Sequence, residues 1–500
     1  MEVIRKNRLL AFWAIAAGLA AVLIWHLPWR FQVNDDEVMM WLVSGAYTGR
    51  PAPYAVFLHP LMSWCISGLY GLAPQLPWYP WLWFLGMFSS FVLLASLVQD
   101  KFGTALQGHV WTLFLFAFYI HFLFFLQFSI VSGFAIFAGL LARYGTVGKG
   151  GQQKTFFRPT DLFLVIGFLV RPEVLLLFLM GVFVLNLLFF REKWFFGLSF
   201  VPFLVAVVGY SISFVWISQS GLSEFERVNR LRSQVFDHPV LQLQKEEIKQ
   251  SHPDLYHFSN GLIDFQNDPQ LVGQLRHWKQ ELDAARWEDF GAGAVAKSFG
   301  TYVEHEHFLI GLMVLFSLFS LFFAGVKALR VLLALVLGML ALSPFFLLKV
   351  QIYGLVFLVL MLSVFCFLPH SPGQRPVSWL FASLVVLAVV FHFRSFFLSS
   401  ANWVPAEGLD QRLGRLQADG YEDIFVIAPA NVYSELLFHN PGRFKVMGWP
   451  TLLEQYQGKL PSDSRAYLVD SATYRGNEAY FEGDEMAGFE SGLYLLLSRP

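Results

Sequence analysis

Charged residues are scarce in this chain of 500 residues, since only 14% are Asp, Glu, Lys or Arg. An average soluble protein carries about 25%. Hydrophobic residues make up 56% of the chain and aromatic residues 18%. The sequence therefore predicts an integral membrane protein with soluble parts attached.

Cysteine, basic charge and internal repeats are also lacking. The two cysteines, Cys65 and Cys366, lie far apart in apolar segments, which excludes a disulfide framework and a thiolate metal site. The formal net charge is −1, so no basic surface for nucleic acid is expected. The absence of repeats argues against a transporter built from duplicated halves.

Long apolar segments are what the chain has instead. The first follows a basic start and ends near Trp25, Trp29 and Arg30. Its roughly 20 apolar residues are enough to cross a bilayer and more than the core of a cleaved signal peptide. Ten further apolar segments lie near 80–98, 109–127, 128–145, 161–171, 174–190, 195–218, 307–325, 331–348, 351–369 and 377–397. The predicted fold class is mainly α, a polytopic transmembrane protein of about 11 helices.

The distribution of positive charge predicts the orientation, because Lys and Arg accumulate in short cytoplasmic loops. We place the N-terminus inside and interpret 56–74 as a helix in, or dipping into, the outer interface. The short outer segments then keep only Arg30, Arg50, Arg171 and Lys349. Counting 56–74 as a full crossing would invert all later loops and place most of the basic residues outside. The C-terminus is therefore expected on the outer side.

Segment 161–190 is interrupted by Arg171-Pro172-Glu173. Charges are costly inside the hydrocarbon, and proline breaks the hydrogen-bond ladder of a helix. We therefore expect a helical hairpin with its tip at the outer face.

Three substantial pieces fall on the outer side in this topology. We predict a transmembrane domain over 1–397, which includes an outer loop at 30–78 and a mainly helical insert at 219–306. The tail, 398–500, is predicted to be a small α/β domain, large enough to fold alone. It contains an amphipathic stretch, "LDQRLGRLQADG", and the strand-like stretches "DIFVIAP", "RFKVMGW", "RAYLVDS" and "GLYLLLSRP".

Three acids stand in a row in "NDDEVMMWLVSGAYTG", residues 34–49. One hypothesis is structural: Asn34 or Asp35 caps a short interfacial helix over 36–44, which Gly45 stops, and the acids suit the helix dipole. The other is chemical, because a carboxylate at the membrane surface can act as general base while a sugar leaves a lipid phosphate. Both stay open, since a cap also holds a carboxylate in place.

A leaving phosphate needs cationic partners, and three basic residues lie at the same expected depth. Arg171 is at the hairpin tip, Lys349 follows the 331–348 helix, and Arg394 lies near the outer end of the last helix. Each alone is typical of a snorkelling side chain. Together they are candidates for binding a phosphate.

The acidic stretch and the "FLHPL" that follows it resemble the first outer loop of membrane glycosyltransferases of the GT-C class. Protein O-mannosyltransferases and lipid A aminoarabinose transferases belong to that class. In those enzymes an Asp-Glu pair opens a helix, and a His-Pro-Pro-Leu or Lys-Pro-Pro-Leu stretch comes later. Asp36-Glu37 and His59-Pro60-Leu61 stand at matching places, although Leu61 replaces the second proline. The plan of many crossings, a large first outer loop and a C-terminal outer domain is also similar.

The resemblance implies an enzyme of a bacterial cytoplasmic (inner) membrane. It would move a sugar from a polyprenyl-phosphate carrier to an envelope glycan, lipid or protein acceptor. The implied base is Asp36, with Asp35 as the alternative if the double Asp shifts the register. Glu37 completes the catalytic candidates, and His59 joins Arg171, Lys349 and Arg394 as a candidate for the donor phosphate.

Two alternatives remain at this point. A polysaccharide polymerase or ligase would use diphosphate-linked glycans. A non-enzymatic transporter-type protein should hide polar residues at mid-membrane, whereas here they gather at the outer edge. "GWP" at 448–450 is interpreted as a turn that can contact an acceptor.

The stretch "YVEHEH", 302–307, is the one candidate metal site. His305 and His307 alternate with glutamates, and on an extended segment such residues can bind a divalent ion. A solvated segment at the membrane edge is the alternative. No other cofactor is expected.

Overall fold

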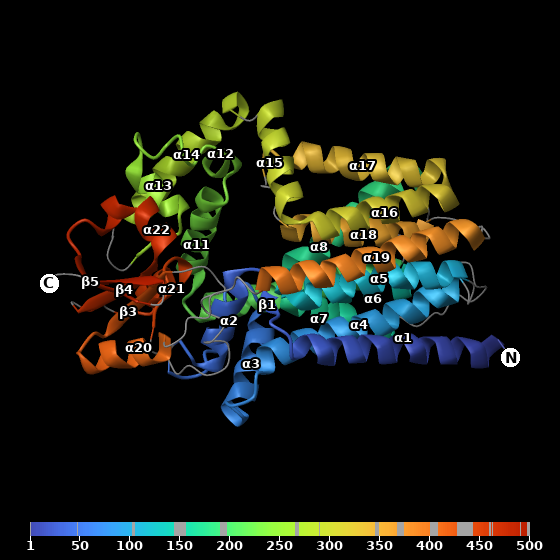
Figure 1. Ribbon diagram of the computed structural model, residues 1–500, viewed down its shortest axis with the longest axis horizontal. Helices are drawn as coiled ribbons and strands as arrows, with labels where there is room; N and C mark the ends of the chain where they lie inside the picture. Colours follow the sequence, from blue (N-terminus) through green and yellow to red (C-terminus); the bar gives the residue numbers. More distant parts are fainter. Residues whose placement is uncertain are drawn as a thin grey trace.

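The computed structural model describes residues 2–47, 49–102, 106–144, 157–190, 198–265, 270–289, 291–345, 350–367, 375–400, 409–427, 444–459, 462, 464–490 and 492–497. Long helices lie side by side at the end that carries the N-terminus, and a small sheet lies at the opposite end (Figure 1). We call the helices at the N-terminal end the bundle and the remaining elements the head.

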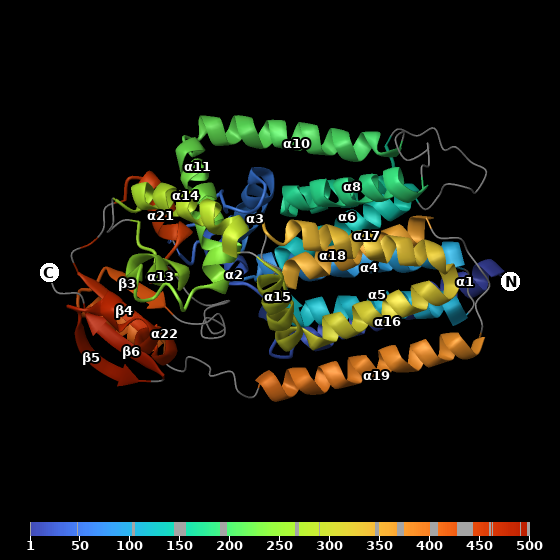
Figure 2. The same ribbon diagram turned by 90° about the horizontal axis from the view of Figure 1, so that it is seen from above.

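All eleven apolar segments form helices of the bundle, so this part of the prediction is confirmed. They are α1 (Glu2–Trp25), α4 (Trp78–Phe102), α5 (Leu106–Phe124), α6 (Phe128–Tyr144), α7 (Leu162–Val170), α8 (Pro172–Leu185), α10 (Phe200–Gln219), α16 (His307–Ala324), α17 (Val326–Leu342), α18 (Val350–Phe367) and α19 (Arg375–Ser400). Among the described residues, α1, α4, α5, α10 and α19 are each long and apolar enough to cross a membrane. In Figure 2, α10 and α19 lie along opposite edges of the bundle.

Segment 161–190 breaks where the sequence predicts. Helices α7 and α8 meet at an angle of 119°, and Arg171 between them is extended, with φ −150° and ψ 98°. Pro172 is the first residue of α8, a position where its missing N–H costs nothing. The break therefore places Arg171 between two helices rather than in a helix interior.

Aromatic and small residues pack the middle of the bundle. Trp111 of α5 lies edge-on to Phe319 of α16, with ring centroids 4.4 Å apart, and to Phe365 of α18 at 5.6 Å. Gly167 of α7 packs so close to α6 that a Cβ there would lie 2.9 Å from the Ser132 carbonyl oxygen. Burial of such rings supplies most of the packing energy.

The first part of the head follows α1. Strand β1 (Arg30–Phe31) pairs in parallel with β2 (Phe125–Leu126). Helix α2 (Asn34–Ser44) ends at Gly45, whose φ of +85° explains the glycine. Helix α3 (Pro60–Leu72) has 13 residues, too few to cross a bilayer, as predicted for 56–74.

The insert is helical, as predicted, and precedes a four-stranded sheet. The insert comprises α11 (Ser223–Phe236), α12 (Pro239–Leu243), α13 (Pro253–Ser259), α14 (Leu271–Asp289) and α15 (Ala292–His305). The tail comprises α20 (Leu409–Ala418), β3 (Asp423–Ile427), α21 (Trp449–Tyr456), β4 (Arg465–Asp470), α22 (Ser471–Gly476), β5 (Glu485–Glu490) and β6 (Leu493–Leu497). The sheet order is β3-β4-β6-β5, and only the β3–β4 pair is parallel.

The strand predicted over "RFKVMGW" is wrong. Only an isolated bridge joins Phe425 to Lys445 there. The chain then turns at Gly448, with φ +99°, to begin α21. Strand β5 was not predicted from the sequence.

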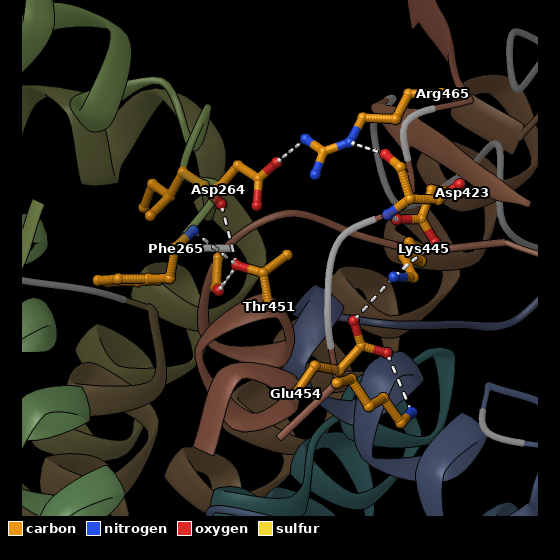
Figure 3. A network of polar contacts seen from close by, with 11 residues as sticks. Asp264, Phe265, Asp423, Lys445, Thr451, Glu454 and Arg465 are labelled. Carbon is orange, nitrogen blue, oxygen red and sulfur yellow. Dashed lines mark hydrogen bonds and ion pairs between the residues drawn. The ribbon is translucent and has the colours of Figure 1, made fainter. Parts of the chain in front are cut away.

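Buried charges fasten the insert to the tail (Figure 3). The Arg465 guanidinium lies 3.0 Å from Asp264 Oδ2, and both side chains are almost fully buried. Thr451 Oγ1 accepts a hydrogen bond from the Phe265 N–H at 3.2 Å. The insert and the tail, which are far apart in the sequence, therefore form one packed unit in the head.

Candidate functional site

A cavity of about 2620 Å³ lies between the bundle and the head. At the head it is lined by charged side chains from α2, α11, α14 and α15. Toward the bundle it is lined by apolar side chains of α8, α16, α18 and α19, among them Leu176, Met180, Val314, Ile352 and Val356. The cavity is therefore polar at one end and apolar at the other.

The acids of α2 divide between two sides of the helix. Asp35 and Glu37 line the cavity. Asp36 is fully buried instead, since its Oδ1 accepts a hydrogen bond from the Tyr79 hydroxyl at 2.8 Å and its Oδ2 accepts one from the Phe128 N–H at 3.2 Å. Asp36 thus ties α2 to α4 and α6.

Burial raises the pKa of Asp36 to about 8, although the hydrogen bonds from Tyr79 and Phe128 oppose the shift and the Asp35 carboxylate adds to it. A carboxyl in such an environment is mostly protonated at pH 7. The Tyr79 and Phe128 contacts therefore hold a side chain that is mostly neutral at this pH.

The capping hypothesis is wrong for this helix. The N-cap residue is Val33, and no side chain caps the helix; Asn34 and Asp35 already lie inside it. The acids still stand in the first turn, where they interact favourably with the helix dipole.

Asp35 is held in place by a residue of the tail. The Trp449 indole N–H donates a hydrogen bond of 3.0 Å to Asp35 Oδ1, and the Trp449 ring lies edge-on to Phe57 at 5.8 Å. The "GWP" stretch therefore begins α21 and fixes a cavity carboxylate.

Glu37 is buried in the cavity wall, and its Oε2 has no hydrogen-bond partner among the described residues. Burial raises the pKa of Glu37 well above its usual value; the nearby Asp36 carboxylate adds to this shift, and Arg30 opposes it. Glu37 therefore presents to the cavity a carboxyl whose protonated form is favoured by burial.

Arg171 lines the cavity where its polar and apolar ends meet. Its guanidinium lies over the rings of Phe57 and Phe128, 5.2 and 5.0 Å from their centroids. Its Nε lies 3.0 Å from Glu173 Oε2. The planar guanidinium is thus held by the faces of two aromatic rings and by one ion pair.

Among the described residues, Arg394 and His59 are not brought together with Arg171. Lys349 lies outside the described residues. Arg394 is exposed on α19 and lines a smaller hollow, which shares Phe391, Ser395 and Ser399 with the cavity. His59 uses both ring nitrogens, because Nδ1 accepts from the Leu61 N–H and Nε2 lies 3.0 Å from the Gly209 carbonyl oxygen. His59 therefore caps α3 and fastens it to α10.

The stretch "YVEHEH" does not form the extended segment that the metal hypothesis requires. Helix α15 ends at His305 and α16 begins at His307, with Glu306 between them. Within the described part of the chain, no group of three or more His, Cys, Asp or Glu side chains could hold a metal ion. His307 lines the cavity, while the side chain of His305 lies outside the described part.

Several cavity residues were missed from the sequence. They are Arg230, Arg232, Lys279, Arg286 and Trp449. The insert reads as an ordinary charged helical segment, so no local pattern singles out its basic residues. Nothing in the "GWP" stretch indicates that its indole reaches α2.

Comparison with known proteins gives two structural neighbours. No protein-family model matches the chain, and no curated protein sequence matches it. ArnT from Cupriavidus metallidurans bound to undecaprenyl phosphate is 12% identical, with a TM-score of 0.43. ArnT from the same organism in the apo state is 13% identical, with a TM-score of 0.41. Each match covers 98% of this chain and 99% of that chain.

ArnT is a lipid A aminoarabinose transferase of the GT-C class, which the first outer loop resembles. With TM-scores below 0.5, the likeness decides nothing about substrate or catalytic residues.

Proposed function

We propose that this membrane protein is a glycosyltransferase that takes a sugar from a polyprenyl-phosphate carrier and transfers it to a hydroxyl or amine acceptor. The observation that carries the proposal is the two-ended cavity. Its volume of about 2620 Å³ exceeds the roughly 300–1,000 Å³ of most small-molecule sites. A sugar on a phosphate with a long apolar chain has the same division of polarity.

The apolar end suits the carrier chain. Leu176, Leu177 and Met180 line it from α8, and Gly311 and Val314 from α16. Each CH₂ group that leaves water gains about 0.8 kcal/mol. An isoprenoid chain along these helices therefore anchors the donor without specific polar contacts.

Arg171 suits the donor phosphate. It stands where the polar and apolar ends of the cavity meet, at the N-terminal end of α8. Guanidinium groups bind phosphate through paired N–H donors, and the helix dipole favours an anion at this end. Stabilising the leaving phosphate lowers the barrier to transfer.

Asp35 suits the role of general base. It faces the cavity, whereas the Asp36 carboxylate is buried behind α2 with both oxygens hydrogen-bonded. A base must lie within hydrogen-bond reach of the proton it removes. The order of preference from the resemblance, Asp36 before Asp35, is therefore reversed in this proposal. Trp449 positions Asp35, and Asp36 positions α2.

A cytoplasmic N-terminus and an outward-facing head belong to the same proposal, because the distribution of Lys and Arg supports them. In a chain lacking Cys65 and Cys366, a cysteine at Ala418 should react with an impermeant maleimide on intact cells. A cysteine at Gly150 should react only after permeabilisation. The opposite pattern would place the charged end of the cavity in the cytoplasm.

Photo-crosslinking tests the donor site directly. A polyprenyl phosphate with a photoactivatable group on its chain should label α8 and α16, and unlabelled carrier should compete. Arg171→Gln should reduce labelling about tenfold or more, since hydrogen bonds to charged groups contribute roughly 1.5–3 kcal/mol. Arg330→Gln, at an exposed position of α17, is the matched control. Labelling confined to exposed α1 residues such as Ile15 and Leu19 would refute the site.

A further inference from the structure

The polar end of the cavity is divided by charge. The insert contributes five basic side chains and three acidic ones to the lining; these are Arg230, Arg232, Lys279, Arg286, Lys297, Asp237, Asp283 and Glu306. The rest of the polar end, which we call the facing wall, has three acidic and two basic side chains; these are Asp35, Glu37, Glu173, Arg30 and Arg171. A wall of one sign focuses the field on ligands of the opposite sign.

Two arginines of this insert wall have donors left for a ligand. Arg232 is buried, and its Nε donates to Asn229 Oδ1 at 2.9 Å. Its terminal nitrogens make no hydrogen bond within the described ranges. Arg230, exposed on α11, has neither a hydrogen bond nor an ion pair to any described residue. Burial lowers the pKa of Arg232, while Asp35 and Asp237 oppose the shift, so an added anion would also favour its charged form.

His238 gives an independent indication of a missing acceptor. It lines the cavity and is 3% exposed. Its Nε2 lies 2.6 Å from Arg286 Nη2, which can only donate, so Nε2 accepts and Nδ1 carries the hydrogen. Asp283 Oδ1, at 3.5 Å from Nε2, is too far for a strong bond. Nδ1 has no partner among the described residues, and a buried donor without an acceptor is costly.

We propose that the insert wall binds a phosphate group of the acceptor substrate, an inference that rests on the proposed glycosyl transfer. The excess of basic over acidic side chains in the insert wall is larger than the single negative charge of a carboxylate. A phosphate monoester carries about −1.5 to −2 charges and matches this excess better. Arg232 is close enough to Asp35 to interact with it electrostatically. A phosphate held there brings a neighbouring acceptor hydroxyl toward the base. The donor phosphate at Arg171 lies on the facing wall.

Equilibrium binding to the full chain purified in detergent tests this site, with inorganic phosphate and farnesyl phosphate as probes. The double variant Arg230→Gln/Lys279→Gln should weaken inorganic phosphate about tenfold or more and leave farnesyl phosphate within about twofold. Arg171→Gln should do the reverse. The matched control is Arg227→Gln/Arg276→Gln, on the same helices α11 and α14 but outside the cavity lining.

Three outcomes would overturn the proposal. The first is that the double variant binds inorganic phosphate as tightly as wild type. The second is that the control pair weakens phosphate binding equally, which would indicate an effect of general surface charge. Alternatively, the double variant weakens both probes equally, which would assign the wall to the donor. Binding is measured without transfer, so the result does not depend on the glycosyltransferase proposal. A failure of the glycosyltransferase proposal would appear in the transfer assay instead.

Discussion

The bundle and the head are held together by different forces. In the bundle, apolar rings pack on one another, as Phe365 does on Trp111 and Phe316. In the head, buried charges join segments far apart in the chain, as Asp264 and Arg465 do across 201 positions. An apolar wall can bind a long apolar chain, whereas fixed charges orient a polar ligand. The cavity lies where the two meet, and each part contributes the end that its own packing suits.

The largest effect should come from breaking a charge pair in the head. Arg465→Met removes the guanidinium that pairs with the buried Asp264 carboxylate, and breaking a buried ion pair typically costs about 3–5 kcal/mol. Limited proteolysis should then cut the tail at lower temperature, while the bundle stays protected. Arg475→Met, at an exposed position of α22, is the matched control.

The double variant Asp264→Leu/Arg465→Met sharpens the same comparison. Replacing both partners by apolar groups is often neutral, so most of the lost stability should return. If Arg465→Met alone leaves the head as resistant as wild type, buried charge does not hold the insert to the tail.

A smaller effect is expected at Asp36, where the head meets the bundle. Its pKa is raised from 3.8 to about 8, so between these values the folded state binds more protons than the unfolded state. Stability contributed by this group is therefore lost as pH rises toward 8. In Asp36→Asn the amide oxygen can accept from the Phe128 N–H and the amide nitrogen can donate to the Tyr79 hydroxyl oxygen, so stability at pH 7 should change by less than about 1.5 kcal/mol.

Thermal melting between pH 6 and 9 checks this prediction. Wild type should lose stability mainly between pH 6 and 8 and level off above the pKa of about 8, and Asp36→Asn should lose less over the same interval. Equal slopes for the two proteins would mean that Asp36 is not protonated in the folded state.

The sequence predicts the bundle better than the head for the same physical reason. An apolar run predicts a membrane helix from local sequence alone. The break at Arg171-Pro172 and the helix end at Gly45 are also predicted from local sequence. The contacts of Asp35 with Trp449 and of Asp264 with Arg465 depend on how distant segments pack. The pattern of the sequence indicates the acidic triplet. It does not indicate which of the three acids faces the cavity, because that depends on the rotation of α2 against α4 and α6.

Transfer of radiolabelled sugar from its polyprenyl-phosphate carrier, in membranes with matched protein levels, tests the central claim most directly. Losing a general base typically costs about 10²–10⁴ in rate. Asp35→Asn should lose that much, and Asp36→Asn should transfer sugar within a few fold of wild type at pH 7, since its side chain is already mostly neutral there. Loss in Asp36→Asn alone, with folding intact, would return the base to the position that the family resemblance implies. Undiminished transfer by Asp35→Asn, Asp36→Asn and the double variant would contradict the account.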